Sequence, residues 1–313
     1  MLQANNALHK KELRRCALVV LAVLFLTALV NSRKSSGNFR VAVDKCENFS
    51  RPLTLDDSGK YVPKQLSELL FAVDHVFVLG VDSCVTTLQH AFSGRATCIV
   101  GRMLDACTPR VYIRGPYTHA MKVSFTHATV LHLAQQAQHK HIAVLEDDVI
   151  IRHGAFTENL VRDFRALLAS NAWGILRLGF RPYFLEKSSR EHCPSKCQCH
   201  IKKNIGEQFC ELSRVGCDMR SSDFYVIHEN YYKLLRSKIL DLRQANSKRI
   251  VDTHPMSHVI KQWLLLPQIS IQTKLDIPVD YQIGLGALYV KKCVHPRPLP
   301  RLVTQQFFNV SGF

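Results

Sequence analysis

The sequence predicts an α/β protein with one domain built on a mostly parallel central sheet. Short apolar runs at residues 75–80, 97–100 and 142–145 do not alternate with polar residues, as expected for strands covered on both faces. Stretches with helical periodicity separate these runs. A strand, a helix and a second strand at this spacing form a βαβ unit, which implies parallel strands.

The elements follow in order from the same patterns. In the longest predicted helix, residues 117–138, apolar residues recur at spacings of three, four and seven, and basic residues follow its end, where positive charge suits a helix C-terminus. The helix at 156–170 has four apolar residues on one side. The run at 173–179 reads as another strand. The remaining predicted helices are 64–73, 85–92, 230–239 and 257–265, and the remaining extended segments are 224–227 and 267–273.

Three acids follow the apolar run 142–145 directly: Glu146, Asp147 and Asp148. In open α/β sheets, ligands bind beyond the carboxyl ends of the strands. Carboxylates at that place can hold a hard cation, and the cation can hold a diphosphate. The alternative is a solvated acidic turn.

The charge balance restricts the class of partner. The chain has 41 Lys and Arg against 25 Asp and Glu, a formal charge of +16, which indicates polyanionic ligands. The basic residues are spread along the chain, with no arginine-rich tract and no zinc-finger spacing. We therefore expect a diphosphate-bearing substrate and no nucleic-acid partner.

The N-terminal region predicts the compartment. Residues 16–30 carry no charge and follow a basic segment, which is typical of a signal anchor. The expected organisation is a cytosolic tail (1–15), an anchor crossing the membrane (16–31), a luminal stem (32–64) and a catalytic domain (65–313), giving a single-pass type II protein. The alternative is a signal peptide cleaved near Ser32, followed by secretion.

Cysteine usage agrees with an oxidising lumen. Ten of the eleven Cys lie beyond the apolar segment and permit up to five disulfide bonds, whose pairing the sequence does not give. An irregular insert at 182–217 holds five of them, and in this compartment disulfides are favoured over a zinc site. Asn48 and Asn309 begin glycosylation sequons, which would make the chain a glycoprotein.

Five sequence blocks in order resemble glycosyltransferase family 25, which includes bacterial lipooligosaccharide galactosyltransferases and the procollagen galactosyltransferases. The resemblance covers roughly residues 75–275 and departs from the family at three places. Residues 80–83 lack the usual Asn-Leu-Asp with following arginines, Thr126 replaces a Ser, and the Cys-rich insert has no counterpart. The blocks are Phe125-Thr126-His127-Ala128, residues 143–149 (AVLEDDV), 173–179 (WGILRLG), 222–227 (SDFYVI), and Val251-Asp252 with Pro267 and Gln272.

The resemblance implies a GT-A type fold and transfer of a sugar, commonly galactose, from a UDP-sugar to a glycan or protein hydroxyl. It places Glu146 and Asp148 at a manganese or magnesium ion, which suits carboxylate and phosphate oxygens. Asp147, Arg177 and His127 would contact the donor. Asp252 or Asp223 would act as general base if the configuration inverts. His254 and His295 are alternative further metal ligands.

Three interpretations remain open from the sequence. The first is a glycosyltransferase of the Golgi or endoplasmic-reticulum membrane. The second is a catalytically silent luminal protein of the same fold that binds carbohydrate or acts as a scaffold. The third is a secreted, disulfide-rich interaction domain whose acids are structural.

Overall fold

A computed structural model of the 313-residue chain describes its secondary structure from residue 50 to residue 295, with gaps. The predicted cytosolic tail, the anchor at 16–31 and nearly all of the stem lie outside the described residues. Within the described part, no helix combines the length and apolar character needed to cross a bilayer. The described ranges are 50–52, 64–80, 96–100, 118–146, 149–151, 157–183, 185, 193–217, 219–220, 222–240, 256, 260–266, 268–272 and 279–295.

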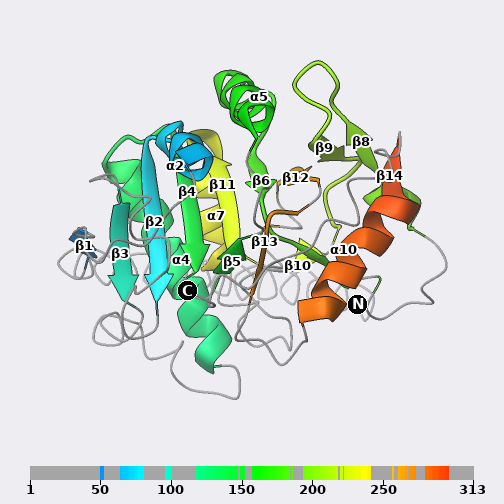
Figure 1. Ribbon diagram of the computed structural model, residues 1–313. Helices are drawn as coiled ribbons and strands as arrows, with labels where there is room; N and C mark the ends of the chain where they lie inside the picture. The colour runs from blue at the N-terminus through cyan, green and yellow to red at the C-terminus, as the bar shows by residue number, and fades with distance from the viewer. Residues whose placement is uncertain are drawn as a thin grey trace, which may run out of the picture. The chain divides into compact units, whose positions relative to one another are not determined.

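A 10-stranded sheet forms the centre of the described structure (Figure 1). Strands β3 (Ala96–Val100), β2 (His75–Gly80) and β4 (His141–Glu146) lie side by side and run parallel, which confirms the parallel pairing predicted for this half of the sheet. The helix predicted at 85–92 lies outside the described residues. The strand order is β1-β3-β2-β4-β11-β6-β12-β9-β8-β14.

The sheet is mixed, so the prediction that it is mostly parallel was wrong. β11 (Phe224–His228) lies between β4 and β6 (Ile175–Arg177) and runs antiparallel to both. Of the neighbouring strand pairs in the described sheet, four are parallel and five are antiparallel. Apolar runs reveal buried strands but not their direction, because both directions bury the same residues.

Helices pack on both faces of the sheet. On one face, α2 (Lys64–Phe71) contacts α5 (Glu158–Ala169), and both contribute buried side chains to a core cluster that includes Val78, Leu145 and Trp263. On the other face, α4 (Thr118–Gln136) packs against α7 (Tyr232–Ile239). The apolar strands are therefore covered on both sides, which explains why their sequences do not alternate.

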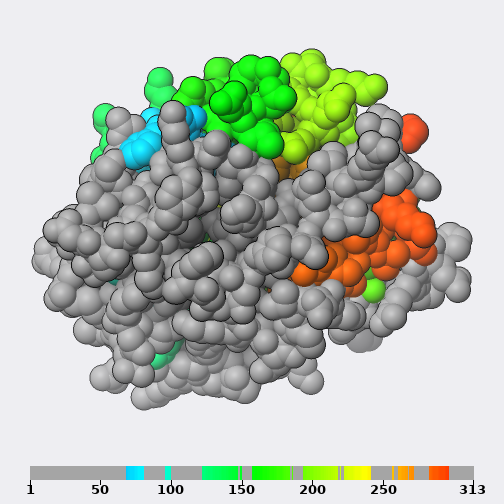
Figure 2. Space-filling view, viewed as in Figure 1, coloured from blue at the N-terminus to red at the C-terminus, as the bar shows by residue number. Residues whose placement is uncertain are grey.

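The Cys-rich insert is more regular than predicted. It contains η4 (Ser195–Cys197), β8 (Cys199–Ile201) and β9 (Phe209–Leu212), and the two strands extend the sheet from β12 (Gln262–Leu265). The turn of this hairpin packs on α5 (Figure 2). A Cβ added to Gly206 in this turn would lie 2.5 Å from the Asp163 carboxylate.

Two assignments near the C-terminus differ from the sequence prediction. The segment 257–265 was predicted to be helical, but the described part forms β12, whose four residues are all buried. Helix α10 (Val279–Cys293), which ends beside the edge strand β14 (Val294–His295), was not predicted. The predicted extended segment at 267–273 contains β13 (Ser270–Gln272), which pairs with β5 (Val149–Ile151). The other short strands are β1 (Ser50–Pro52), β7 (Arg181–Pro182) and β10 (Met219–Arg220), and η5 (Glu229–Tyr231) follows β11.

Candidate functional site

The C-terminal end of β4, in the middle of the sheet, brings together charged residues that are far apart in the sequence. β4 ends at Glu146, and β11 begins directly after Asp223. Phe224 pairs with Leu145 in the antiparallel register, and the Glu146 backbone N–H donates a hydrogen bond to the Asp223 carbonyl at 2.8 Å. The two carboxylate-bearing residues therefore sit opposite each other at the carboxyl end of β4.

Arg177 ends β6 on the other side of β11 and pairs with Tyr225 in the register. Tyr225 in turn pairs with Val144 of β4, so the side chains of this row point to one face of the sheet. Glu146 and Asp223 lie two residues from members of the same row. Strand alternation therefore directs them to that face as well.

His127 of α4 covers this face and connects two of the residues. Its Nδ1 lies 2.9 Å from the Tyr225 hydroxyl, and its Nε2 lies 3.5 Å from Glu146 Oε1. His127 and Tyr225 are fully buried, whereas the Glu146 side chain is 20% exposed. An ionised carboxylate only accepts hydrogen bonds, so the arrangement favours the tautomer in which Nε2–H faces Glu146 and the tyrosine O–H donates to Nδ1.

Tyr225 is held as a neutral hydroxyl by its surroundings. Burial raises the pKa of Tyr225 well above its usual value, the Glu146 carboxylate raises it further, and the Arg177 guanidinium opposes the rise. The phenol can therefore act as a hydrogen-bond donor to His127 at any physiological pH.

Arg177 is a fully buried cation whose orientation is set by β12. Its Nε donates to Gln262 Oε1, and the Gln262 amide nitrogen donates to the Cys217 carbonyl at 3.1 Å. These contacts fix the guanidinium on the row of Tyr225, two residues back from Glu146 and Asp223, and its charge adds positive potential at the C-terminal end of β4.

Asp223 is fully buried, in contrast to Glu146. The Ser270 hydroxyl donates to Asp223 Oδ2 at 3.2 Å. Gly179 makes this contact possible, because an added Cβ there would lie 2.5 Å from the same carboxylate oxygen and 2.9 Å from the Ser270 carbonyl. Only a residue without a side chain fits at this position.

The donor chemistry of Glu146 suits a hard cation such as manganese or magnesium. Its carboxylate is partly exposed, accepts a hydrogen bond from the Ser222 hydroxyl at 3.2 Å and faces the His127 ring. Oxygen ligands of this kind are the ones such ions prefer. Within the described ranges, no group of three or more His, Cys, Asp or Glu is placed to hold a metal ion. The neighbouring Asp147 and Asp148 lie outside those ranges.

The structure thus unites Glu146, Asp223, Arg177 and His127, which were selected from separate stretches of sequence. Asp147, Asp148, Asp252 and His254 lie outside the described residues. His295 belongs to β14 at the far edge of the sheet, six strands along from β4, where its ring approaches that of His200.

Sequence reasoning missed two members of this group, Tyr225 and Gln262. Each is a buried polar residue in an apolar strand, β11 and β12 respectively. The signal that could have identified them is a residue with a polar group in a short, mostly apolar strand, because such a group needs an internal hydrogen-bond partner when it is buried.

Comparison with known proteins gives no assignment for this group: no family model matches the chain, and no curated protein is significantly similar to it.

Proposed function

We propose that this chain is a metal-dependent glycosyltransferase with a GT-A type fold, which moves a sugar from a nucleotide-diphosphate donor to a hydroxyl of a glycan or glycoprotein. UDP-galactose is the first donor to test, from the family resemblance. The proposal includes a type II membrane anchor at residues 16–31 and placement in the Golgi or endoplasmic-reticulum membrane.

One observation carries the proposal. β4 ends in Glu146, which lies opposite Asp223 at the C-terminal end of the strand. The buried Arg177 lies on β6, level with Tyr225 and therefore two residues back from Asp223 along the strands. A partly exposed carboxylate with a buried cation two strands away on the same face of the sheet suits a ligand that combines a metal ion with a negatively charged diphosphate. The carboxyl edge of parallel strands is also where α/β proteins bind ligands.

The metal ion, when bound, would stabilise the negative charge that develops on the leaving diphosphate. Glu146 and Asp148 would hold it through their carboxylate oxygens. His127, supported by Tyr225, would keep the Glu146 carboxylate oriented toward the edge. Arg177 would attract the diphosphate by its charge, and Asp147 would bind donor hydroxyls.

Of the two acids proposed as general base, Asp252 lies outside the described residues, and the burial of Asp223 argues against the other. Asp223 is buried and already accepts the Ser270 hydroxyl, so we assign it to shaping the edge around Gly179. A general base must come within hydrogen-bond reach of the acceptor hydroxyl, which requires access that the buried Asp223 carboxylate lacks.

Screening the purified full-length chain against a panel of nucleotide sugars, with and without Mn²⁺, tests the proposal. The expected result is metal-dependent release of a nucleoside diphosphate from one donor. Asp148→Asn should abolish this release while leaving the melting temperature nearly unchanged. Glu229→Gln is the matched control, because this exposed acid follows the opposite end of β11, and it should retain full activity.

Two outcomes would replace the proposal. Metal-dependent donor binding without turnover on any acceptor would indicate the silent carbohydrate-binding protein. A collapsed melt for Asp148→Asn, with no donor bound by the parent chain, would show that the acids serve the fold and that the chain is an interaction domain.

A further inference from the structure

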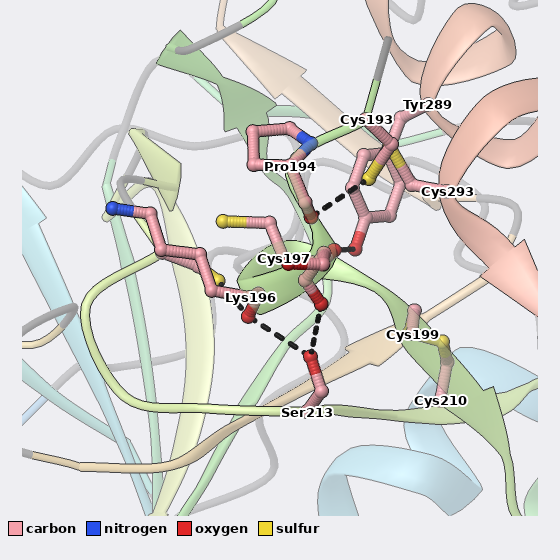
Figure 3. The surroundings of a disulfide bond; sticks show 11 residues. Cys193, Pro194, Lys196, Cys197, Cys199, Cys210, Ser213, Tyr289 and Cys293 are labelled. Atoms are coloured by element: carbon pink, nitrogen blue, oxygen red, sulfur yellow. Dashed lines mark hydrogen bonds between the residues drawn. A yellow bond between two sulfur atoms is a disulfide. The ribbon is translucent and has the colours of Figure 1, made fainter.

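The cysteines around the β8–β9 hairpin form a dense group at one end of the sheet. Two disulfides pair four of them: Cys193 with Cys293 at the end of α10, and Cys199 with Cys210 across the hairpin (Figure 3). Cys197, in η4, and Cys217, beyond β9, are the other two cysteines of the segment and are present as thiols.

These two thiols lie against each other inside the protein. Cys197 is 1% exposed and Cys217 is fully buried, and both belong to the same core cluster. The Cys217 thiol donates to the Lys196 carbonyl at 2.9 Å, next to Cys197 in the chain. A hydrogen bond between the two thiols, together with burial, raises the pKa of Cys217.

The surrounding contacts hold both backbones in place. The Tyr289 hydroxyl of α10 donates to the Cys197 carbonyl at 2.9 Å, and the Ser213 hydroxyl donates to the Lys196 carbonyl at the same distance (Figure 3). Two thiols in hydrogen-bond contact are close enough for a cross-link to be considered between them.

We propose that Cys197 and Cys217 are joined by a third disulfide in the mature protein. Each Sγ loses its proton, an S–S bond forms, and two electrons and two protons pass to a disulfide of glutathione or of a thiol oxidoreductase, which becomes two thiols. This exchange takes place before the segment folds, because a buried thiol with a raised pKa yields little reactive thiolate.

The disulfide would stabilise the position of Arg177 in the candidate site through Gln262. The Cys217 carbonyl accepts the hydrogen bond from the Gln262 amide nitrogen, and the Gln262 oxygen accepts one from Arg177. Fixing Cys217 to η4 therefore fixes the backbone group that orients Gln262, and through it Arg177. The inference holds whether or not the chain proves to be a transferase.

Peptide mapping of the full chain, produced through a secretory pathway, tests the pairing. The unreduced protein is denatured, alkylated and digested with trypsin, whose sites after Lys196, Lys202, Lys203, Arg214 and Arg220 give peptides 197–202, 204–214 and 215–220. The expected product is one cluster of all three peptides, because the first contains both Cys197 and Cys199.

Recovery of peptide 215–220 as a separate alkylated species, with one alkylated cysteine in 197–202, would overturn the proposal. So would fragmentation between Cys197 and Cys199 that shows the exchanged pairing, Cys197 with Cys210. The Cys193–Cys293 pair is the internal reference for an oxidised sample.

The variant Cys217→Ser supplies the matched comparison. It should give a two-peptide cluster with one alkylated cysteine, and a melting temperature lower by roughly 5–10 °C because the unfolded chain loses a constraint. The wild-type map decides the pairing even if this variant folds poorly.

Discussion

Replacing Tyr225 with Phe removes one oxygen from the centre of the candidate site. Tyr225 and His127 are fully buried, and the hydroxyl lies 2.9 Å from His127 Nδ1. Phe keeps the ring and its packing but leaves Nδ1 buried without its donor. An unsatisfied buried acceptor costs about 1–3 kcal/mol, so Tyr225→Phe should lower the free energy of unfolding by that amount.

Urea denaturation of the full chain measures this change, and a thermal melt should show a loss of about 2–4 °C per kcal/mol for a protein of this size. Tyr232→Phe is the matched control, because the Tyr232 hydroxyl is also buried and has no hydrogen-bond partner among the described residues. That variant should change the free energy of unfolding by less than about 0.5 kcal/mol. Equal stabilities of the two variants would refute the proposed Tyr225–His127 hydrogen bond.

Three further predictions concern the stability of the fold. Burial lowers the pKa of His75 from 6.5 to about 4. The contribution of His75 to stability should therefore be full above pH 6.5 and fall as the pH drops from 6.5 toward 4, because the unfolded chain binds the proton first. His75→Gln should reduce this loss in melts compared between about pH 7 and about pH 5. Gly179→Ala should lower the free energy of unfolding, measured in urea, by about 1–3 kcal/mol, because the added Cβ meets Asp223 and Ser270. Gly284→Ala should raise it by roughly 0.5–1 kcal/mol, because the Cβ added in α10 meets open space. A Gly179→Ala protein more stable than the Gly284→Ala protein would contradict the close approach at Gly179. Thr157→Ala should cost about 1 kcal/mol by removing the N-cap hydrogen bond of α5, and Thr157→Ser should restore most of it; equal stability of all three proteins would show that the cap contributes nothing.

Local pattern was sufficient for elements whose burial and length are unambiguous. The strand predicted at 75–80 forms β2 with the same bounds, and the long helix predicted at 117–138 forms α4. The segment 257–265 was misassigned because a short apolar run suits a buried strand as well as a buried helix. α10 was missed because Gly284 and Gly286 lower its intrinsic helix propensity. Packing compensates for this: Leu285, Tyr289 and Val290 are buried, and Gly286 allows Gln268 to approach closely.

The position of the acidic residues after β4 could be predicted from the sequence, but the residues that surround them could not. Glu146 directly follows the apolar run 142–145, so its place at the C-terminal end of β4 could be predicted from the sequence. The position of Asp223 beside it depends on β11 entering between β4 and β6 in the antiparallel direction, which no local pattern specifies. The Tyr225–His127 contact joins residues 98 positions apart and follows from that strand order.

Calorimetric titration of UDP into the purified chain, with and without Mn²⁺, measures whether the chain binds a nucleoside diphosphate through a metal ion held by Glu146. We expect binding that requires the metal and that weakens at least about tenfold, or about 1.4 kcal/mol, in Glu146→Gln, while Glu229→Gln binds like the parent chain. Equal affinity of Glu146→Gln and the parent chain, or no UDP binding by the parent chain with Mn²⁺ present, would contradict it.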